Sequence, residues 1–263
     1  MLKGVTIGQF VPGNSFVHRL DPRTKLLVSL VLVVSIFTIA KLPGFALLAS
    51  FILLATVVSR IPVWMILRGL RPILFLLVIT WLLHAFTDPG RILYTFGPLK
   101  VTYEGIAQGF EVVARLALLM FGTTLVTLTT SPVSLTDGLE YLLGPLKKVG
   151  LPVSELAMMM TIALRFIPTL LDEAERIMKA QEARGADFTS GGLAKRVQAM
   201  IPLLVPLFVS AFQRADELAI AMEARAYRPG EKRGRLHELK MRPKDLVTLI
   251  FSCSFFIYLG IIF

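Results

Sequence analysis

The sequence is poor in the residues that build reactive or metal-binding sites. It contains a single cysteine, Cys253, and three histidines, His18, His84 and His237, which lie far apart. One cysteine excludes an internal disulfide and a multi-cysteine metal site, and the histidines lack the short spacings of metal ligands. The G-x-x-x-x-G-K-[S/T] segment that holds ATP phosphates is also absent. We therefore expect no catalytic residue, no metal ligand and no cofactor-binding residue in this chain.

Acidic residues are missing from the long apolar runs of the chain. Five such runs occupy residues 26–40, 45–58, 72–86, 112–130 and 246–263. With a hydrophobic content of 55% and a mean hydropathy of +0.70, they indicate an integral membrane protein. Residues 1–25 lack the apolar core of a cleavable signal peptide, so we expect the first run to stay in the protein. The predicted fold is all-α and polytopic, with about five transmembrane helices plus long helices on the cytoplasmic side.

The segments between the first four runs differ in character. Lys41–Gly44 is predicted to be a tight turn, because it contains Pro43 and Gly44. Residues 60–71 are predicted to form a basic connector, and residues 87–110 a loop with a little extended structure at 99–103.

Residues 131–242 form a different block, which combines apolar stretches with many charges. A short helix is predicted between Pro132 and Pro145. Two longer helices are predicted at about 152–185 and 193–226, each about 50 Å long at 1.5 Å per residue. Each begins apolar and ends charged, which indicates a helix that is partly embedded in the membrane and emerges into water.

This pattern predicts three domains. Residues 1–130 would form a membrane domain with four transmembrane helices. Residues 131–242 would form a second domain with one short and two long helices, and residues 243–263 a C-terminal transmembrane helix.

The basic residues predict the orientation in the membrane. With five spans and the N-terminus inside, 24 of the 28 lysines and arginines fall on the cytoplasmic side. This distribution follows the positive-inside rule. We therefore expect a multi-pass protein with a cytoplasmic N-terminus and with the charged ends of the long helices in the cytoplasm.

Two similar segments close the long helices, 41 residues apart. Each places an arginine between small residues, as Ala183-Arg184-Gly185 and as Ala224-Arg225-Ala226. A single arginine at a helix C-terminus is well explained by its favourable interaction with the helix dipole. The repetition favours a second interpretation, in which two helix ends press into grooves of soluble partners and the guanidinium groups reach their carbonyls or carboxylates.

Other features of the long helices leave alternatives open. The Met158-Met159-Met160 run suits either core packing or an adaptable contact surface, because thioether side chains repack easily. Pro168, Pro202 and Pro206 lie inside the predicted helices and should kink them.

The acidic cluster Asp172, Glu173 and Glu175 resembles a metal site but better fits a solvated helix face paired with Arg176 and Lys179.

Three classes of function remain to be compared. A self-sufficient carrier or a lipid-modifying enzyme needs a polar constellation within the bilayer, and the apolar runs offer no convincing one. A nucleic-acid anchor is disfavoured, because fourteen acidic residues are interspersed between residues 131 and 245. A membrane protein that docks on two similar soluble partners requires only the features already described.

Three further motifs accompany the two arginine segments: His18-Arg19-Leu20-Asp21-Pro22-Arg23-Thr24-Lys25, Pro145-Leu146-Lys147-Lys148 with Gly150-Leu151-Pro152, and Leu164-Arg165-Phe166-Ile167-Pro168. Through these motifs the chain resembles the transmembrane T component of energy-coupling factor (ECF) transporters, the EcfT and CbiQ proteins, over nearly its whole length. The second arginine segment has Ala226 where the family often has glycine.

The resemblance implies a subunit of an ABC-type importer in the membrane of a prokaryotic cell. Family members join two cytoplasmic ATPase subunits, which bind ATP and Mg²⁺, to a membrane S component that binds a vitamin or a metal ion. ATPase docking is implied for Ala183, Arg184, Gly185, Ala224, Arg225 and Ala226. Contact with the S component is expected at Met158, Met159, Met160, Pro168, Pro202 and Pro206. The expected partners are these subunits and the lipid bilayer, without nucleic acid.

Overall fold

The computed structural model describes residues 10–39, 41–96, 99–186, 188, 192–228 and 241–263. The described residues fall into two compact units. Residues 10–141 and 241–263 form one, which we call the membrane unit, and residues 142–228 form the other, the long-helix unit.

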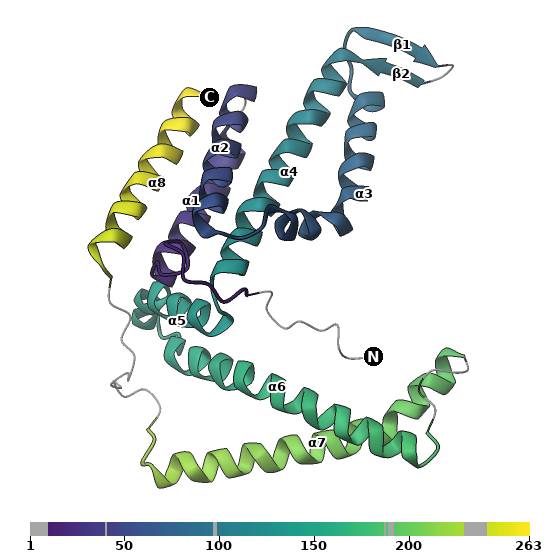
Figure 1. Cartoon of the computed structure of the whole chain (residues 1–263), viewed down its shortest axis with the longest axis vertical. Coiled ribbons are helices and arrows are strands. Elements are labelled where there is room, and N and C mark those ends of the chain that lie inside the picture. The colour runs from purple at the N-terminus through teal and green to yellow at the C-terminus, as the bar shows by residue number, and fades with distance from the viewer. Residues whose placement is uncertain (1–9, 40, 97–98, 187, 189–191, 229–240) are drawn as a thin grey trace. The chain divides into compact units, whose positions relative to one another are not determined.

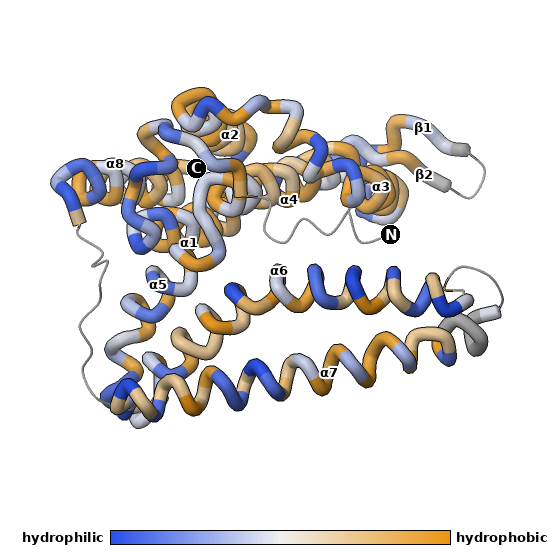
Figure 2. The backbone as a smooth tube through the Cα atoms, turned by 60° about the horizontal axis from the view of Figure 1, so that its bottom comes forward, coloured by the Kyte–Doolittle hydropathy of each residue, from blue (hydrophilic) through white to orange (hydrophobic). Residues whose placement is uncertain are grey.

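The membrane unit contains the five predicted apolar helices (Figure 1). They are α1 (Pro22–Thr38), α2 (Leu42–Ser59), α3 (Val63–Thr87), α4 (Tyr103–Thr129) and α8 (Pro243–Ile262). A shorter helix, α5 (Pro132–Leu142), follows α4. Figure 2 shows hydrophobic residues along most of this unit, as expected for helices that face hydrocarbon on one side and each other on the other.

All three predicted connectors differ from the structure. Most of the turn predicted at Lys41–Gly44 is helical, because α2 already begins at Leu42 and Pro43 fits the first turn of a helix. Most of the supposed basic connector is helical, because α3 already begins at Val63, directly after Pro62, and continues through Pro72. Its ribbon bends in Figure 1, as a proline inside a helix explains. The predicted loop contains an antiparallel hairpin of β1 (Ile92–Phe96) and β2 (Leu99–Thr102). The non-helical segment ends before residue 110, because α4 already begins at Tyr103. The Thr102 hydroxyl caps this helix by accepting a hydrogen bond from the Gly105 N–H at 3.1 Å.

The main hydrophobic cluster of the membrane unit joins α1, α2, α4 and α8. Ile36, Leu48 and Leu259 are fully buried, and Phe51 stacks on Phe255 with ring centroids 5.1 Å apart. Close approach of α1 and α4 depends on Gly122, since a Cβ at this position would lie 2.7 Å from the Leu32 side chain. Helices therefore pack closely through small residues, as is common in membranes.

A cluster of charged residues ties the beginnings of α1 and α8 to the end of α4. The buried carboxylate of Asp245 accepts hydrogen bonds from the backbone N–H of Asp21 at 2.9 Å and of Arg242 at 2.8 Å. The Lys25 ammonium donates to the Thr129 carbonyl at 2.9 Å, and the Arg23 guanidinium lies 3.5 Å from the centre of the Tyr141 ring. We call Asp21, Arg23, Lys25, Thr129 and Asp245 the polar junction.

The long-helix unit consists of a short 3-10 helix, η2 (Gly144–Val149), and two long helices, α6 (Val153–Ala183) and α7 (Leu193–Ala224). Their bounds agree closely with the predicted helices, and Pro168, Pro202 and Pro206 lie inside them as expected. The helices run in opposite directions and pack against one another (Figures 1 and 2). Arg214 of α7 and Glu173 of α6 form an ion pair between them at 3.6 Å.

Six helices of the described chain are long and apolar enough to cross a membrane: α2, α3, α4, α6, α7 from Val197 onward, and α8. The 17-residue α1 is not one of these six. The prediction of an all-α, polytopic membrane protein is therefore confirmed, and the two long helices are themselves apolar enough to enter the membrane in part.

Candidate functional site

The first arginine segment ends α6 in a defined backbone geometry. Arg184 is the last residue with near-helical dihedral angles, and Gly185 follows in the left-handed region with φ of 88°. The Gly185 N–H donates to the Glu182 carbonyl and the Ala186 N–H to the Gln181 carbonyl, both at 2.9 Å. This pair of hydrogen bonds is the Schellman motif, which satisfies carbonyls that a helix end leaves open.

The second arginine segment ends α7 in the same way. Arg225 occupies the equivalent position, and Ala226 follows with a positive φ of 55°. The Ala226 N–H donates to the Glu223 carbonyl at 2.9 Å, and the Tyr227 N–H to the Met222 carbonyl at 3.0 Å. The backbone conformation therefore explains why a small residue follows each arginine, because glycine adopts a left-handed conformation easily and few other residues do.

Both arginines are free to meet another molecule. Each is exposed, and within the described part of the chain neither side chain has an ion pair or a hydrogen bond. Backbone N–H groups already cap both helices, so the guanidinium groups are not needed for that task. Glu182 and Glu223, two residues before each arginine, are exposed as well, which gives both helix ends the same arrangement of charge.

The two helix ends point away from each other within the long-helix unit. Because α6 and α7 are antiparallel, their C-terminal ends lie at opposite ends of the pair (Figures 1 and 2). The Glu173–Arg214 ion pair joins equivalent positions, since Glu173 precedes Arg184 by eleven residues and Arg214 precedes Arg225 by eleven. Each arginine tip therefore lies about 16 Å along its helix from the ion pair, and the two tips lie in opposite directions from it.

The long helices also expose apolar side chains. On α6, Met159 and Met160 are 57% and 46% exposed, whereas Met158 is partly buried. The three interior prolines, Pro168, Pro202 and Pro206, are exposed. The methionines and prolines expected at an S component are therefore mostly on the surface of this unit, with Met158 as the partial exception.

A longer apolar stripe on α7 was not singled out from the sequence. Its members recur every three or four residues and are all exposed: Val197, Met200, Ile201, Leu204, Val205, Phe208, Val209 and Phe212. This spacing puts them on one face of the helix. The spacing itself was the signal that could have identified them, because a stripe of this length without charges is unusual on a water-exposed helix.

The acidic cluster of α6 takes part in ion pairs. Glu175 pairs with Lys179 at 3.0 Å, as the sequence predicted, and Glu173 pairs across to Arg214. In the residues that the structure describes, no three histidine, cysteine, aspartate or glutamate side chains come together as metal ligands would.

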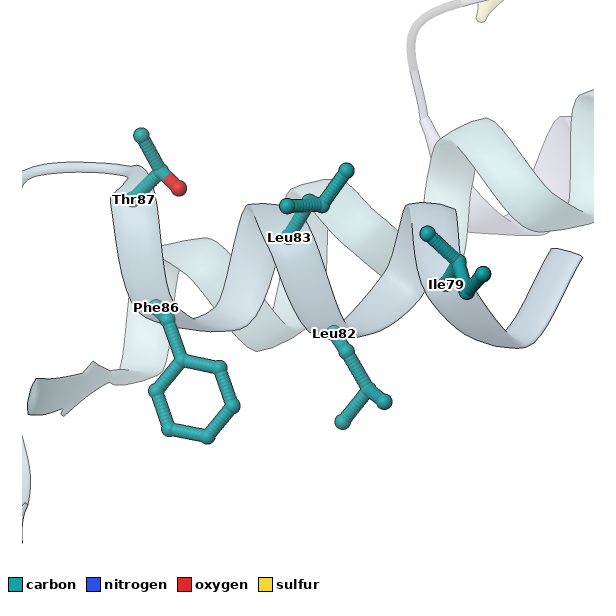
Figure 3. Close-up of a pocket in the computed structure, with 5 residues that line it drawn as sticks. All are labelled: Ile79, Leu82, Leu83, Phe86 and Thr87. Atoms are coloured by element: carbon teal, nitrogen blue, oxygen red, sulfur yellow. The ribbon is translucent and has the colours of Figure 1, made fainter. Parts of the chain in front are cut away.

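A hollow of about 320 Å³ lies along the C-terminal half of α3. Ile79, Leu82, Leu83, Phe86 and Thr87 line it, and Figure 3 shows their side chains extending from a single helix with the Thr87 hydroxyl as the polar atom among them. A site for a polar solute needs several converging polar groups. This hollow instead suits a hydrocarbon chain.

The chain is similar to curated proteins over nearly its full length. The family described as "Cobalt transport protein" (CbiQ) matches residues 13–258. The "Energy-coupling factor transporter transmembrane protein EcfT" of Thermosediminibacter oceani is 53% identical over 249 residues, which cover 95% of this chain and 94% of the relative.

Two further EcfT proteins match at a similar level. That of Acidaminococcus fermentans is 49% identical over 260 residues, which cover 99% of this chain and 97% of the relative. That of Bacillus subtilis is 48% identical over 263 residues, which cover 98% and 99%. The chain therefore belongs to the EcfT/CbiQ family, the energy-coupling transmembrane components of ECF transporters.

Proposed function

We propose that this chain transmits ATP-driven movement from two cytoplasmic ATPase subunits to a membrane S component during uptake of a vitamin or a metal ion. The observation that carries the proposal is the pair of arginine tips. Two helices of one unit end in the same Schellman motif, each with an exposed arginine, at opposite ends of an antiparallel pair. Two equivalent tips are suited to two similar partners.

Each tip would dock into one ATPase subunit. A guanidinium group offers five donors in a planar arrangement, which matches carboxylates and helix-end carbonyls of a partner. Ala183 and Ala224 before the arginines, and Gly185 and Ala226 after them, keep the helix ends narrow enough to enter a groove. ATP and Mg²⁺ would be bound by the ATPases, so this chain would be non-catalytic and would need no cofactor of its own.

The S component would contact the apolar faces of the long helices. The stripe on α7 and the exposed methionines of α6 offer hydrophobic surface to a partner that is itself embedded in the membrane. Because apolar side chains lack directional bonds, such a surface allows a partner to slide and reorient while it remains attached. Met158, Pro168, Pro202 and Pro206 belong to the same expected contact region.

The proposed mechanism requires one orientation. The arginine tips must lie in the cytoplasm of a prokaryotic cell, where the ATPases are, and the N-terminus must then lie on the same side. The distribution of lysine and arginine supports this orientation.

Charge reversal at both tips tests the proposal. Arg184→Glu with Arg225→Glu should abolish binding of both ATPase subunits and reduce uptake at least about a hundredfold, since each tip would lose a buried, hydrogen-bonded cation. The measurements are co-purification of the ATPases and uptake by whole cells. The matched control is Arg176→Glu with Lys179→Glu, which makes the same change in charge on exposed positions of α6.

The control should retain ATPase subunits and uptake. Undiminished uptake by the double tip variant, with normal amounts of protein in the membrane, would refute the proposal. So would transport by the purified chain alone, which is the behaviour of a self-sufficient carrier.

A further inference from the structure

We propose that the membrane unit carries a binding site for the head group of an anionic phospholipid, in a hollow between the loop before α1 and the beginning of α8. The hollow has a volume of about 220 Å³. Its lining includes Arg19 from the loop and Arg242 and Lys244 from the start of α8. Two segments that are more than 200 residues apart in sequence thus bring three cations to one place.

These cations are available for an anion. All three residues are exposed, and no ion pair joins them to an acid among the residues that the structure describes. The one carboxylate of the lining, Asp245, is 3% exposed, and its two oxygens accept the N–H groups of Asp21 and Arg242. The lining therefore has an excess of two positive charges, which favours a phosphodiester.

The loop that supplies Arg19 is held in place by His18. The imidazole Nδ1 lies 2.7 Å from the Ser15 hydroxyl, and Nε2 lies 3.1 Å from the Val11 carbonyl. Burial, helped by the charge of Lys25, lowers the pKa of His18 even though the bond to Val11 acts in the opposite direction. The ring is therefore neutral near pH 7 and positions the loop without adding a further cation to the site.

The surroundings of the hollow favour a lipid over a soluble anion. The candidate transmembrane helix α8 begins at Pro243, so Lys244 lies in the first turn of a span. Val247 and Phe251 follow Lys244 by three and seven residues, on the same helix face, and are 66% and 62% exposed. Phe16, which is 46% exposed, also lines the hollow. A phosphate held by the cations would have its acyl chains along this apolar face, which is the usual arrangement of basic lipid sites at a membrane boundary.

Lipid titration of the purified full-length protein tests the site. Phosphatidylglycerol and phosphatidylcholine with identical acyl chains are added in detergent, and retained lipid is counted by native mass spectrometry. We expect phosphatidylglycerol to bind at least about tenfold more tightly. Arg19→Gln with Arg242→Gln and Lys244→Gln should remove this preference, because each basic group near an anionic head group contributes about fivefold.

The matched control removes three exposed basic residues of the same unit outside the hollow, by Arg60→Gln, Arg68→Gln and Arg71→Gln. This variant should keep the preference for phosphatidylglycerol. Equal loss in both triple variants would overturn the site, because it would show general charge attraction.

Two further measurements keep the test decisive. Competition by glycerol 3-phosphate at the concentration at which lipid binds would overturn the lipid assignment in favour of a soluble phosphate. If the triple variant fails to fold, Lys244→Gln alone should weaken phosphatidylglycerol binding about fivefold, and Lys244→Arg should restore it. Unchanged binding by Lys244→Gln would contradict the proposal.

Discussion

The polar junction of the membrane unit and the two helix ends of the long-helix unit place their charged residues in opposite environments. In the membrane unit, charged residues such as Asp245 and Lys25 are buried and hydrogen-bonded to backbone groups of distant segments. In the long-helix unit, Arg184 and Arg225 are exposed, and the apolar stripe of α7 is exposed as well. The polar junction thus uses charged residues to hold the membrane unit together, whereas the arginines that end α6 and α7 lie at the surface of the long-helix unit.

This difference separates residues that maintain the fold from residues that meet partners. A buried carboxylate with two backbone donors is costly to remove, because the donors are left without an acceptor. An exposed arginine or phenylalanine without neighbours contributes little to the stability of its own chain. Substitutions in the two units should therefore affect different measurements, namely folding in one and assembly in the other.

The largest effect that would sharpen this comparison is expected at Asp245. Asp245→Ala leaves the buried N–H of Asp21 without its acceptor and removes the acceptor of the Arg242 N–H. We expect a loss of about 3 kcal/mol in the free energy of unfolding of the membrane unit, at about 1.5–3 kcal/mol for each hydrogen bond to a charged group. The loss is measured as a fall in the melting temperature of the purified protein in detergent.

Asp216→Ala on α7 is the control, because Asp216 is an exposed acid without a described partner. Its melting temperature should match that of the unchanged protein. If Asp245→Ala and Asp216→Ala melted at the same temperature, the polar junction would not have the structural role assigned to it.

An intermediate effect is expected at the residue after each arginine. Gly185→Ala and Ala226→Val place a more restricted side chain at a positive φ and should weaken the helix end by about 1–2 kcal/mol. Ala226→Gly should instead strengthen it slightly. Amide hydrogen exchange of the N–H groups that close the two Schellman motifs measures these changes, because it reports local opening.

The same variants connect backbone geometry with docking. Gly185→Ala and Ala226→Val should reduce co-purification of the ATPase subunits, and Ala226→Gly should not. Retention of the ATPases by Ala226→Val, despite faster exchange, would mean that only the arginine and not the shape of the helix end matters.

The smallest effect is expected at the ion pair between the long helices. Glu173 and Arg214 are partly exposed, with side-chain exposures of 26% and 37%, and lie 3.6 Å apart. Such a pair contributes about 0.2–1 kcal/mol. Glu173→Arg should therefore lower the melting temperature only slightly, and adding Arg214→Glu should restore it.

The pair Glu175–Lys179 within α6 provides a comparison, since it does not join the two helices. Its exchange, Glu175→Lys with Lys179→Glu, should leave uptake unchanged. If Glu173→Arg also left both the melting temperature and uptake unchanged, the Glu173–Arg214 ion pair would not help to hold α6 and α7 together.

Much of the fold followed from local sequence pattern. The apolar runs predicted α1, α2, α4 and α8, and the change from apolar to charged predicted α6 and α7 almost to the residue. The start of α3 at Val63 was missed, because Arg68 and Arg71 interrupt the apolar pattern there and Pro62 suggested a break.

The candidate site was recoverable only in part. The repeated arginine segments were visible in the sequence, but the left-handed conformation of Ala226 was not, because alanine seldom adopts it. The apolar stripe of α7 could have been found from its spacing. Its exposure could not, since the same spacing usually marks a face that packs against the rest of the protein.

The sequence by itself determined most of the helical segments, the apolar character of the membrane unit and where the two arginines lie along their helices, because periodicity, hydropathy and charge are properties of neighbouring residues. Only the tertiary structure decided that Asp245 would receive the N–H of Asp21, 224 residues away, and that Arg19 would meet Arg242 and Lys244 around one hollow. Such contacts depend on how distant helices pack, and packing is set by the shapes of many side chains together rather than by any local pattern.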